Sequence, residues 1–229
     1  MTSMAISRVL LTSSASLSSA LQSFSVLSMS GLMTTYLIAI GYSLSLITTV
    51  RILSSLVELT PTILVPWIIS LLSQGNTDPL WPLSRIGTWG LGWQTLCLIA
   101  PTIGLFYLQR LGMDPASFTL SPTLTALFFS TMCLSRFGAW THNLVTQNVV
   151  QITVPVDQRA QFSGVEMAFV SAAEITRWSC GAVWPRPEQF PGLGTASFCT
   201  VAFNYVLFKI WAERWSKRGS ARITLDAED

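Results

Sequence analysis

The sequence predicts an all-α, polytopic membrane protein, a bundle of six transmembrane helices. Half of the 229 residues are hydrophobic and only 10% are charged, against about 25% in soluble proteins. So few charges cannot cover a water-facing surface, whereas side chains that face lipid need to be apolar. Long apolar stretches also recur along the chain, separated by short segments rich in glycine, proline and polar residues.

The apolar stretches predict the six spans in order, since a membrane-crossing helix needs about 20 mostly apolar residues. The first is rich in serine, threonine and methionine, and Gly31 marks a point where it can bend or break. The second contains Pro61 and Pro66, which mark further such points. The fourth and fifth carry polar and charged groups near their middles, and Pro185 and Pro187 separate the fifth from the sixth. The expected spans are 17–40, 44–72, 86–108, 122–150, 162–184 and 193–211.

Three regions follow from these spans. We expect an N-terminal cytoplasmic segment over 1–16, a six-helix lobe over 17–211 and a cytoplasmic tail of mixed charge over 212–229. No compact apolar core with a small-residue cleavage site begins the chain, so the first span is expected to be a retained membrane helix.

The loop charges predict an orientation with both termini in the cytoplasm. Lys and Arg are enriched in cytoplasmic loops, and this topology places eight of them inside and two outside, although five of the eight come from the tail. The inner set is Arg8, Arg85, Arg159, Lys209, Arg214, Lys217, Arg218 and Arg222, and the outer set is Arg110 and Arg186.

Composition also argues against other classes of protein. The net charge of +2 is too small to indicate nucleic-acid binding. The four cysteines lie in apolar stretches without a CxxC pair and are expected to be free thiols. One histidine excludes a multi-histidine metal site within the chain, and no nucleophile and base are recognisable, so we expect neither an enzyme nor a bound cofactor.

Charged residues inside the spans are candidate cavity residues, because such groups usually pair or face a polar cavity. Arg51 and Glu58 are seven residues apart and project from one face of the second span. Glu174 and Arg177 are three apart and are expected to pair along the fifth. Structural ion pairs and a polar cavity for a charged solute both fit. The candidate set is Arg51, Glu58, Arg136, His142, Asn143, Glu174 and Arg177.

His142 lies in the fourth span between Thr141 and Asn143. Imidazole can hold a proton or a cation, and it can equally be hydrogen-bonded in helix packing. Both interpretations remain open from the residues alone.

From the fourth span onward, the chain resembles the ferroportin family, the iron exporters of solute carrier family 40. The residues that carry the resemblance are Ser135-Arg136-Phe137-Gly138-Ala139-Trp140, Asn143-Leu144-Val145-Thr146-Gln147, Val154-Pro155, Gly164-Val165 and Trp184-Pro185-Arg186-Pro187-Glu188-Gln189-Phe190. The resemblance implies a major-facilitator-type fold of twelve helices, in which two six-helix lobes rock about a central cavity and release ferrous iron outward, so that the six predicted helices form one lobe of a major-facilitator-type transporter. This chain would be the second lobe, with the lipid bilayer and a first lobe as its partners.

The resemblance also implies where a metal would bind, and there this chain departs. The family's second-lobe site uses a cysteine in the first of these helices and a histidine in the fifth, and the matching positions here are Gly31 and Arg177. Glycine offers no ligand, and a guanidinium repels a cation. The family also has an acidic residue one turn before that histidine, and here Glu174 keeps this acidic type. The remaining candidate metal ligands are therefore His142 and Glu174, which lie on different helices.

Three functions remain open at this point. The first is a ferroportin-like half-transporter of ferrous iron or another divalent cation. The second is a non-transporting lobe or partner protein, favoured by Gly31 and Arg177. The third is a transporter of a different, anionic solute, favoured by Arg51, Arg136 and Arg177.

Overall fold

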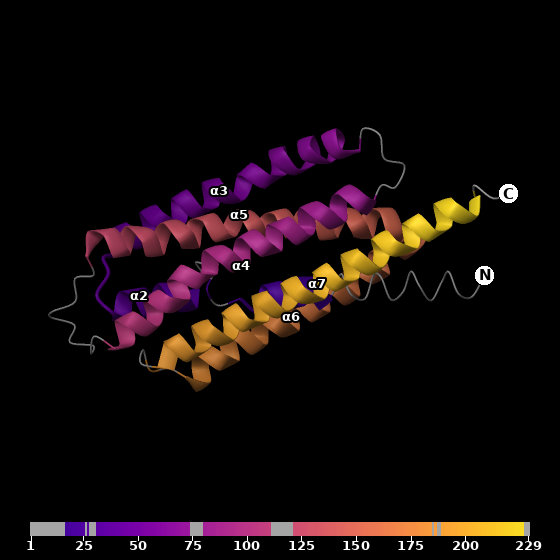
Figure 1. The fold of residues 1–229 in the computed structure, drawn as a ribbon. Coiled ribbons are helices and arrows are strands. Elements are labelled where there is room, and N and C mark those ends of the chain that lie inside the picture. The colour runs from indigo at the N-terminus through magenta and orange to yellow at the C-terminus, as the bar shows by residue number, and fades with distance from the viewer. Residues whose placement is uncertain are drawn as a thin grey trace.

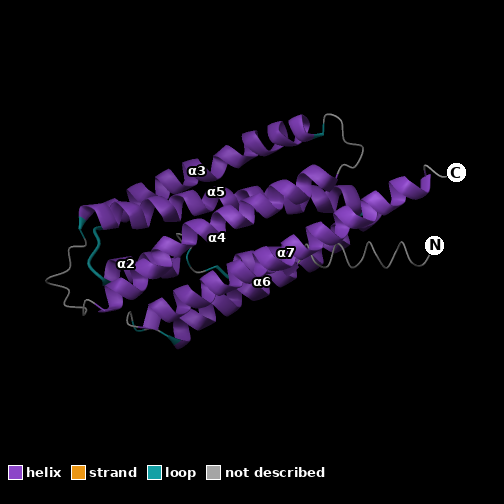
Figure 2. Ribbon diagram, in the orientation of Figure 1, coloured by secondary structure: helices purple, strands orange, loops and turns teal. Residues whose placement is uncertain are grey.

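The computed structural model describes residues 17–25, 27, 31–73, 80–110, 121–184, 186 and 189–226, with backbone alone at 108–110 and 215–226. These residues form an all-α bundle (Figures 1 and 2). A helical segment over 17–23 comes first. It is followed by α2 (Gly31–Ala39), α3 (Leu44–Leu72), α4 (Leu80–Arg110), α5 (Pro122–Thr153), the 3₁₀ turn η1 (Val156–Gln158), α6 (Arg159–Val183) and α7 (Phe190–Asp226).

Helix α4 is the centre of the packing. It lies against α5 on one side and α7 on the other, and α3 packs on α5 (Figure 1). Gly41 has a φ of 93°, which only glycine adopts readily, and it lets the chain reverse between α2 and α3. Ser43 then caps α3, since its side chain accepts a hydrogen bond from the Leu46 amide.

The crossing of α4 and α5 depends on two glycines. A Cβ added to Gly138 would overlap the Gly90 carbonyl oxygen and lie 2.9 Å from the Gln94 amide nitrogen. A Cβ on Gly90 would lie 3.0 Å from the Gly138 carbonyl oxygen. Small residues at such crossings allow two membrane helices to approach closely, because lipid supplies no hydrophobic force to drive them together.

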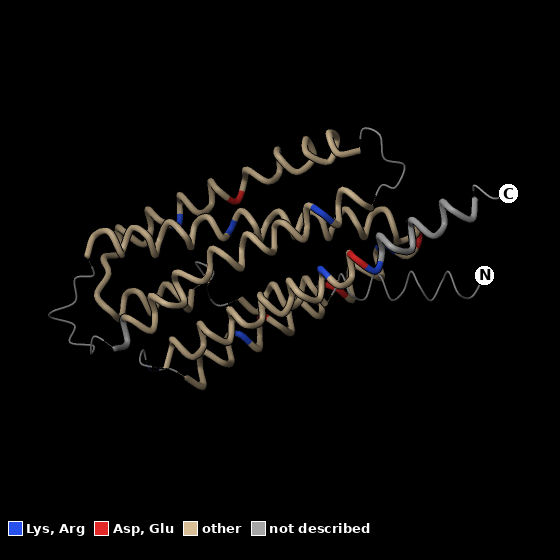
Figure 3. Tube along the Cα trace, viewed as in Figure 1, with Lys and Arg blue, Asp and Glu red and all other residues tan. Residues whose placement is uncertain are grey.

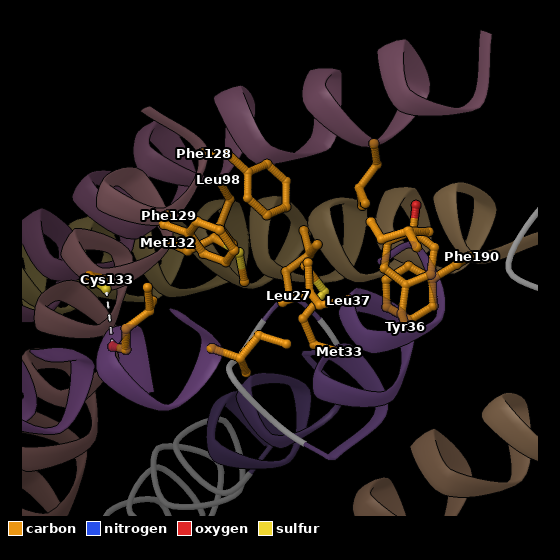
Figure 4. Close-up of a cluster of buried hydrophobic side chains, with 14 of the residues drawn as sticks. Leu27, Met33, Tyr36, Leu37, Leu98, Phe128, Phe129, Met132, Cys133 and Phe190 are labelled. Atoms are coloured by element: carbon orange, nitrogen blue, oxygen red, sulfur yellow. Dashed lines mark hydrogen bonds between the residues drawn. The ribbon is translucent and has the colours of Figure 1, made fainter. Parts of the chain in front are cut away.

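Two groups of buried apolar side chains fill the bundle. The first joins α2 to the N-terminal part of α5 and includes Leu37, Leu98 and Phe129 (Figure 4). In this group, the ring of Tyr36 stacks on that of Phe190 with centroids 4.1 Å apart. The second group joins α3, α4, α5 and α7 and is formed by Val65, Leu80, Leu83, Ile86, Leu91, Val145, Val149 and Phe208.

The helix boundaries confirm several predictions and correct others. The second span is found where expected, as α3, and it continues through Pro61 and Pro66. The first span is corrected: the helix over 17–23 ends and α2 begins again only at Gly31. The described part of the predicted cytoplasmic tail is helical, because α7 continues to Asp226, and the cytoplasmic location of this tail stays a prediction. Few positions within the bundle are charged, and those of α7 lie toward its C-terminal end (Figure 3).

Three helices of the described part of the chain are long and apolar enough to cross a membrane: Leu44–Leu72, Leu80–Tyr107 and Phe190–Arg214. The sequence predicts six. Helices α5 and α6 have the necessary length but carry polar groups along their sequences, among them Arg136, Glu174 and Arg177. The first predicted span is divided by the break before α2. The four cysteines are free thiols, as predicted.

Candidate functional site

The break before α2 exposes backbone groups that a continuous helix would pair. The last carbonyls of any helix have no partner within it, and the segment over 17–23 ends in a turn in which the Ser25 amide donates to the Gln22 carbonyl. Helix α7 supports the chain beyond the turn, because the Ser197 hydroxyl accepts from the Leu27 amide at 3.3 Å. The hydroxyls of Ser25 and Ser197 also lie 3.2 Å apart.

Arg177 of α6 is the cation that faces this break. Its Nη1 donates to the carbonyl oxygens of Ser23 at 3.1 Å and Ser25 at 3.5 Å. Its Nη2 lies 3.9 Å from the Glu174 carboxylate, so the pair expected along the fifth span is present. The Arg177 side chain is only 13% exposed, whereas that of Glu174 is 50% exposed. A positive charge next to a helix C-terminus complements the partial negative charge of the last carbonyls.

A small polar pocket of about 180 Å³ lies at the break. It is lined from the first helical segment, α5 and α6, so it is a junction of three parts of the chain. The structure therefore brings together four of the seven predicted cavity residues: Arg136, Asn143, Glu174 and Arg177. The lining residues are Gln22, Ser23, Ser25, Arg136, Ala139, Trp140, Asn143, Glu174 and Arg177.

Arg136 is held by an acid from a neighbouring helix. Its Nε donates to Glu58 Oε1 at 2.6 Å, and the two side chains are 25% and 22% exposed. Glu58 therefore pairs with a residue of α5. Arg51, which was predicted to lie on the same face of α3 as Glu58, is exposed and does not line the pocket. This ion pair ties α3 to the pocket wall.

Neutralising one partner of this pair is expected to destabilise the protein more than neutralising both. Glu58→Gln or Arg136→Gln leaves a lone charge in a low-dielectric setting, whereas the double variant leaves none. We expect the summed losses in free energy of unfolding of the two single variants to exceed the loss in the double variant by about 2 kcal/mol. Thermal unfolding of the four proteins in one detergent measures this coupling. Additive effects of the two changes would show that the two side chains are not energetically coupled.

The resemblance implies metal ligands at the positions of Gly31 and Arg177, and in this structure the first makes a close packing contact and the second carries a positive charge. A Cβ on Gly31 would lie 2.8 Å from Cη2 of Trp178, so a larger residue there requires the indole ring to move. The neighbouring Arg177 directs its guanidinium to the carbonyls of the helix break. Within the described residues, no group of three or more His, Cys, Asp or Glu side chains could hold a metal ion.

His142 is enclosed in a separate polar network. It is fully buried, and its Nε2 lies 2.7 Å from the Ser18 hydroxyl and 3.4 Å from that of Thr146. The Ser18 hydroxyl donates to Asn204 Oδ1 at 2.7 Å, and Asn204 Nδ2 returns a bond to the Ser18 carbonyl. The network joins the first helical segment, α5 and α7. Of the two candidate metal ligands, only Glu174 lines the pocket.

Several pocket and network residues were not among the sequence candidates. Gln22, Ser23 and Ser25 line the pocket, and Asn204 binds the network that contains His142. Their only signal in the sequence is the unusual Ser content of the first span and a lone Asn in an apolar one. Uncharged polar side chains are common in membrane helices as local hydrogen-bond donors, so this signal is weak.

A helical bundle with a discontinuous first helix and a polar pocket at the discontinuity is typical of one lobe of a secondary transporter. The model of the Ferroportin1 (FPN1) family matches residues 7–201. The chain therefore belongs to the ferroportin family. It is a transporter-family protein, and no enzyme activity is associated with this class.

Relatives and solved structures agree with this assignment. The chain is 30% identical over 207 residues to solute carrier family 40 member 2 of Arabidopsis thaliana, covering 86% of this chain and 35% of that protein. It is 28% identical over 200 residues to solute carrier family 40 member 1 of Arabidopsis thaliana, covering 83% of this chain and 33% of that protein. Thus the chain spans about a third of the length of these relatives.

The fold matches a bacterial homologue of the iron transporter ferroportin. The inward-facing crystal structure aligns with a TM-score of 0.73 at 23% identity, covering 87% of this chain and 44% of that chain. The outward-facing structure with soaked iron aligns with a TM-score of 0.71 at 23% identity, covering 87% and 45%. The bundle therefore corresponds to a little under half of a complete transporter of this fold.

Proposed function

We propose that this chain is the second lobe of a ferroportin-type transporter that exports ferrous iron by alternating access. The carrying observation is the match of the FPN1 family model to residues 7–201. The polar pocket at the helix break supports the proposal, since transporters place substrate sites at such discontinuities near the bilayer midplane. The homologous bacterial structures, described as inward-facing and outward-facing, are consistent with a rocking motion of two lobes.

In this proposal all six segments cross the membrane and both termini face the cytoplasm. Helices α3 to α7 alternate in direction along the bundle (Figure 1), and the loop charges favour the cytoplasm for the end that holds Arg85, Arg159 and Lys209. The break in the first segment and the charges of α5 and α6 then lie on the side that faces the central cavity.

A first lobe is required because this lobe alone leaves polar surface in lipid. Helix α6 has no buried residue, and it carries Glu174 on the pocket side, with a side chain that is half exposed. Charged groups that face hydrocarbon are costly unless a cavity or a partner covers them. We propose that the first lobe covers this face and supplies the metal ligands, since Arg177 and Gly31 leave none at the matching positions of this lobe.

Iron efflux from cells is the direct test. The chain is produced together with the first lobe of the Arabidopsis member 2 protein, in cells loaded with radioactive iron. We expect efflux only when both lobes are present, because one bundle cannot alternate access. Transport by the isolated, monomeric chain would contradict the two-lobe proposal.

The same cells separate the alternatives. Lobes that co-purify without moving iron, cobalt or zinc would identify a non-transporting partner, the function that the loss of the family's ligands favours. Glu174→Ala and His142→Gln, introduced into the active pair, report whether this lobe adds a ligand, and efflux within about twofold of the parent is expected from both. A loss of efflux in either variant, with unchanged amounts in the membrane, would return a ligand to this lobe.

A further inference from the structure

A second and larger cavity lies on a different face of the bundle, between α4 and α7. Its volume is about 800 Å³. We call it the α4–α7 groove and define it by its lining: Trp81, Ser84, Arg85, Thr88, Trp89, Gly92, Trp93, Leu96, Tyr205, Lys209, Ala212 and Glu213. None of these residues lines the polar pocket at the helix break, so the transport proposal does not use this site.

The groove has an aromatic wall along α4. Trp89 and Trp93 stack with ring centroids 5.7 Å apart, and the Trp93 indole donates to the Leu134 carbonyl at 3.0 Å. Trp89 is 55% exposed and Leu96 is 64% exposed, although both are large apolar side chains. On the α7 side, Tyr205 lies against Gly92, where a Cβ would come within 3.3 Å of its ring. The absence of a side chain at Gly92 thus lets the Tyr205 ring pack closely against α4 and form part of the groove lining.

One end of the groove is basic. Arg85 and Lys209 are both exposed and line the same cavity from opposite helices. The guanidinium of Arg85 lies 5.1 Å from the centre of the Trp81 ring, which holds it at the rim. Within the described part of the chain, neither cation forms an ion pair, since the ion pairs found there involve Arg136 and Arg177. Glu213 is the one acid in the lining.

The dimensions of the groove match one leaflet of a bilayer. Helices rise 1.5 Å per residue, so Trp81 and Leu96 are about 22 Å apart along α4 and Arg85 is about 16 Å from Leu96. A leaflet has about 15 Å of hydrocarbon and about 6 Å of headgroup region. If Leu96 lies at the midplane, Arg85 lies at the boundary between acyl chains and headgroups, and Trp81 lies among the headgroups. Tryptophan prefers this interfacial depth.

We propose that the α4–α7 groove binds an anionic phospholipid, with its acyl chain along Trp89, Trp93 and Leu96 and its phosphate between Arg85 and Lys209. Basic pockets between membrane helices on the cytoplasmic side hold anionic headgroups in this way. The proposed orientation of the chain places Arg85 and Lys209 on that side. The bound lipid fills a gap between α4 and α7 that no described side chain occupies.

Tryptophan fluorescence can report occupancy, because Trp89 and Trp93 form the wall of the groove. The purified chain is placed in nanodiscs of phosphatidylcholine containing increasing amounts of brominated phosphatidylglycerol, whose bromines quench nearby indoles. Brominated phosphatidylcholine serves as the neutral comparison. We expect phosphatidylglycerol to quench at several-fold lower mole fraction. Arg85→Gln and Lys209→Gln should each reduce this preference about fivefold.

The charge variants have a matched control variant and a second variant that is expected to have the opposite effect on lipid preference. Arg186→Gln removes one positive charge from the exposed turn that precedes α7, far from the groove in the fold, and should leave the preference unchanged. Glu213→Gln removes the acid from the lining and should increase the preference, an effect that a merely destabilised protein would not show. Helical content by circular dichroism confirms that each variant is folded.

Three outcomes would overturn the proposal. Equal quenching by the two brominated lipids would show ordinary annular lipid without headgroup recognition. Relief of quenching by millimolar glycerol phosphate in solution would show a site for a soluble phosphate instead. An unchanged preference in the Arg85→Gln/Lys209→Gln variant would show that these cations do not hold the headgroup. None of these results depends on iron transport, so failure here leaves the transporter proposal standing.

Discussion

Gly138→Ala is expected to destabilise the bundle more than any other single methyl addition at a described glycine. The added Cβ would overlap the Gly90 carbonyl oxygen and crowd the Gln94 amide nitrogen. Both obstacles are backbone atoms of α4, which cannot turn aside as a flexible side chain can. Overpacking of this kind costs about 1–3 kcal/mol. We expect the upper end of this range and a fall in melting temperature of about 10 °C, measured in detergent.

Gly164→Ala is the matched control for Gly138→Ala. Gly164 is also inside a helix, α6, and a Cβ there would have no atom within 4 Å. Alanine is the better helix former by about 1 kcal/mol, so this variant should be as stable as the parent or slightly more so. Equal melting temperatures for the two alanine variants would contradict the close α4–α5 crossing.

Arg177→Met is expected to loosen the break before α2. Methionine keeps much of the side-chain length but cannot donate to the carbonyls of Ser23 and Ser25. A hydrogen bond to a charged group contributes about 1.5–3 kcal/mol. The amides of Phe24, Ser25 and Leu27 are hydrogen-bonded around the break, so their hydrogen exchange should accelerate by about tenfold or more. Exchange measured by mass spectrometry on peptides that cover residues 17–39 reports this change.

Arg177→Lys separates the effect of charge from that of geometry. An ammonium group keeps the positive charge but lacks the planar fork that reaches two carbonyls and the Glu174 carboxylate together. Exchange at the break should therefore be intermediate between the parent and Arg177→Met. Helix α7 away from Ser197 serves as an internal reference and should exchange equally in all three proteins. Parent-like exchange in Arg177→Met would mean that the guanidinium does not hold the break.

Arg177 places a fixed positive charge at the helix break of this lobe. The resemblance implies a histidine ligand at this position, whereas here a guanidinium donates directly to the carbonyls of the discontinuous helix. A fixed charge of this kind neutralises the helix end permanently and does not depend on metal. This difference is the physical basis for assigning the metal ligands of the proposed transporter to the first lobe.

Much of the helical architecture could be predicted from the sequence. The bounds of α3 were predicted to the residue, and α5 and α6 to within a few, because apolar length is the main signal of a membrane helix. The discontinuity of the first span was only suggested by Gly31, and its extent was not predicted. The polar side chains of this span are also typical of a continuous serine-rich helix, because hydropathy does not indicate where the backbone hydrogen bonds of a helix end.

The candidate site was predicted in part. Glu174 and Arg177 were expected to pair, because residues three apart on one helix are neighbours whatever the fold, and the structure confirms the contact. The partner of Arg136 could not be inferred from spacing along a single helix. Nor could the enclosure of His142 by Ser18, Thr146 and Asn204, whose two most distant members are 186 residues apart.

The sequence by itself therefore determined the class of protein, the all-α membrane bundle, the family and the local pairs within one helix. These features depend on composition, on apolar length and on short motifs, all of which are properties of contiguous residues. Only the tertiary structure decided that Glu58 reaches Arg136, that Arg177 closes the helix break, and that α4 and α7 leave a groove between them. These contacts depend on which helices are neighbours and on the register of each pair, that is, the relative position of the two helices along their axes. In a bundle whose lipid-facing and packed surfaces are both apolar, that register is set by glycine contacts and polar pairs between distant segments.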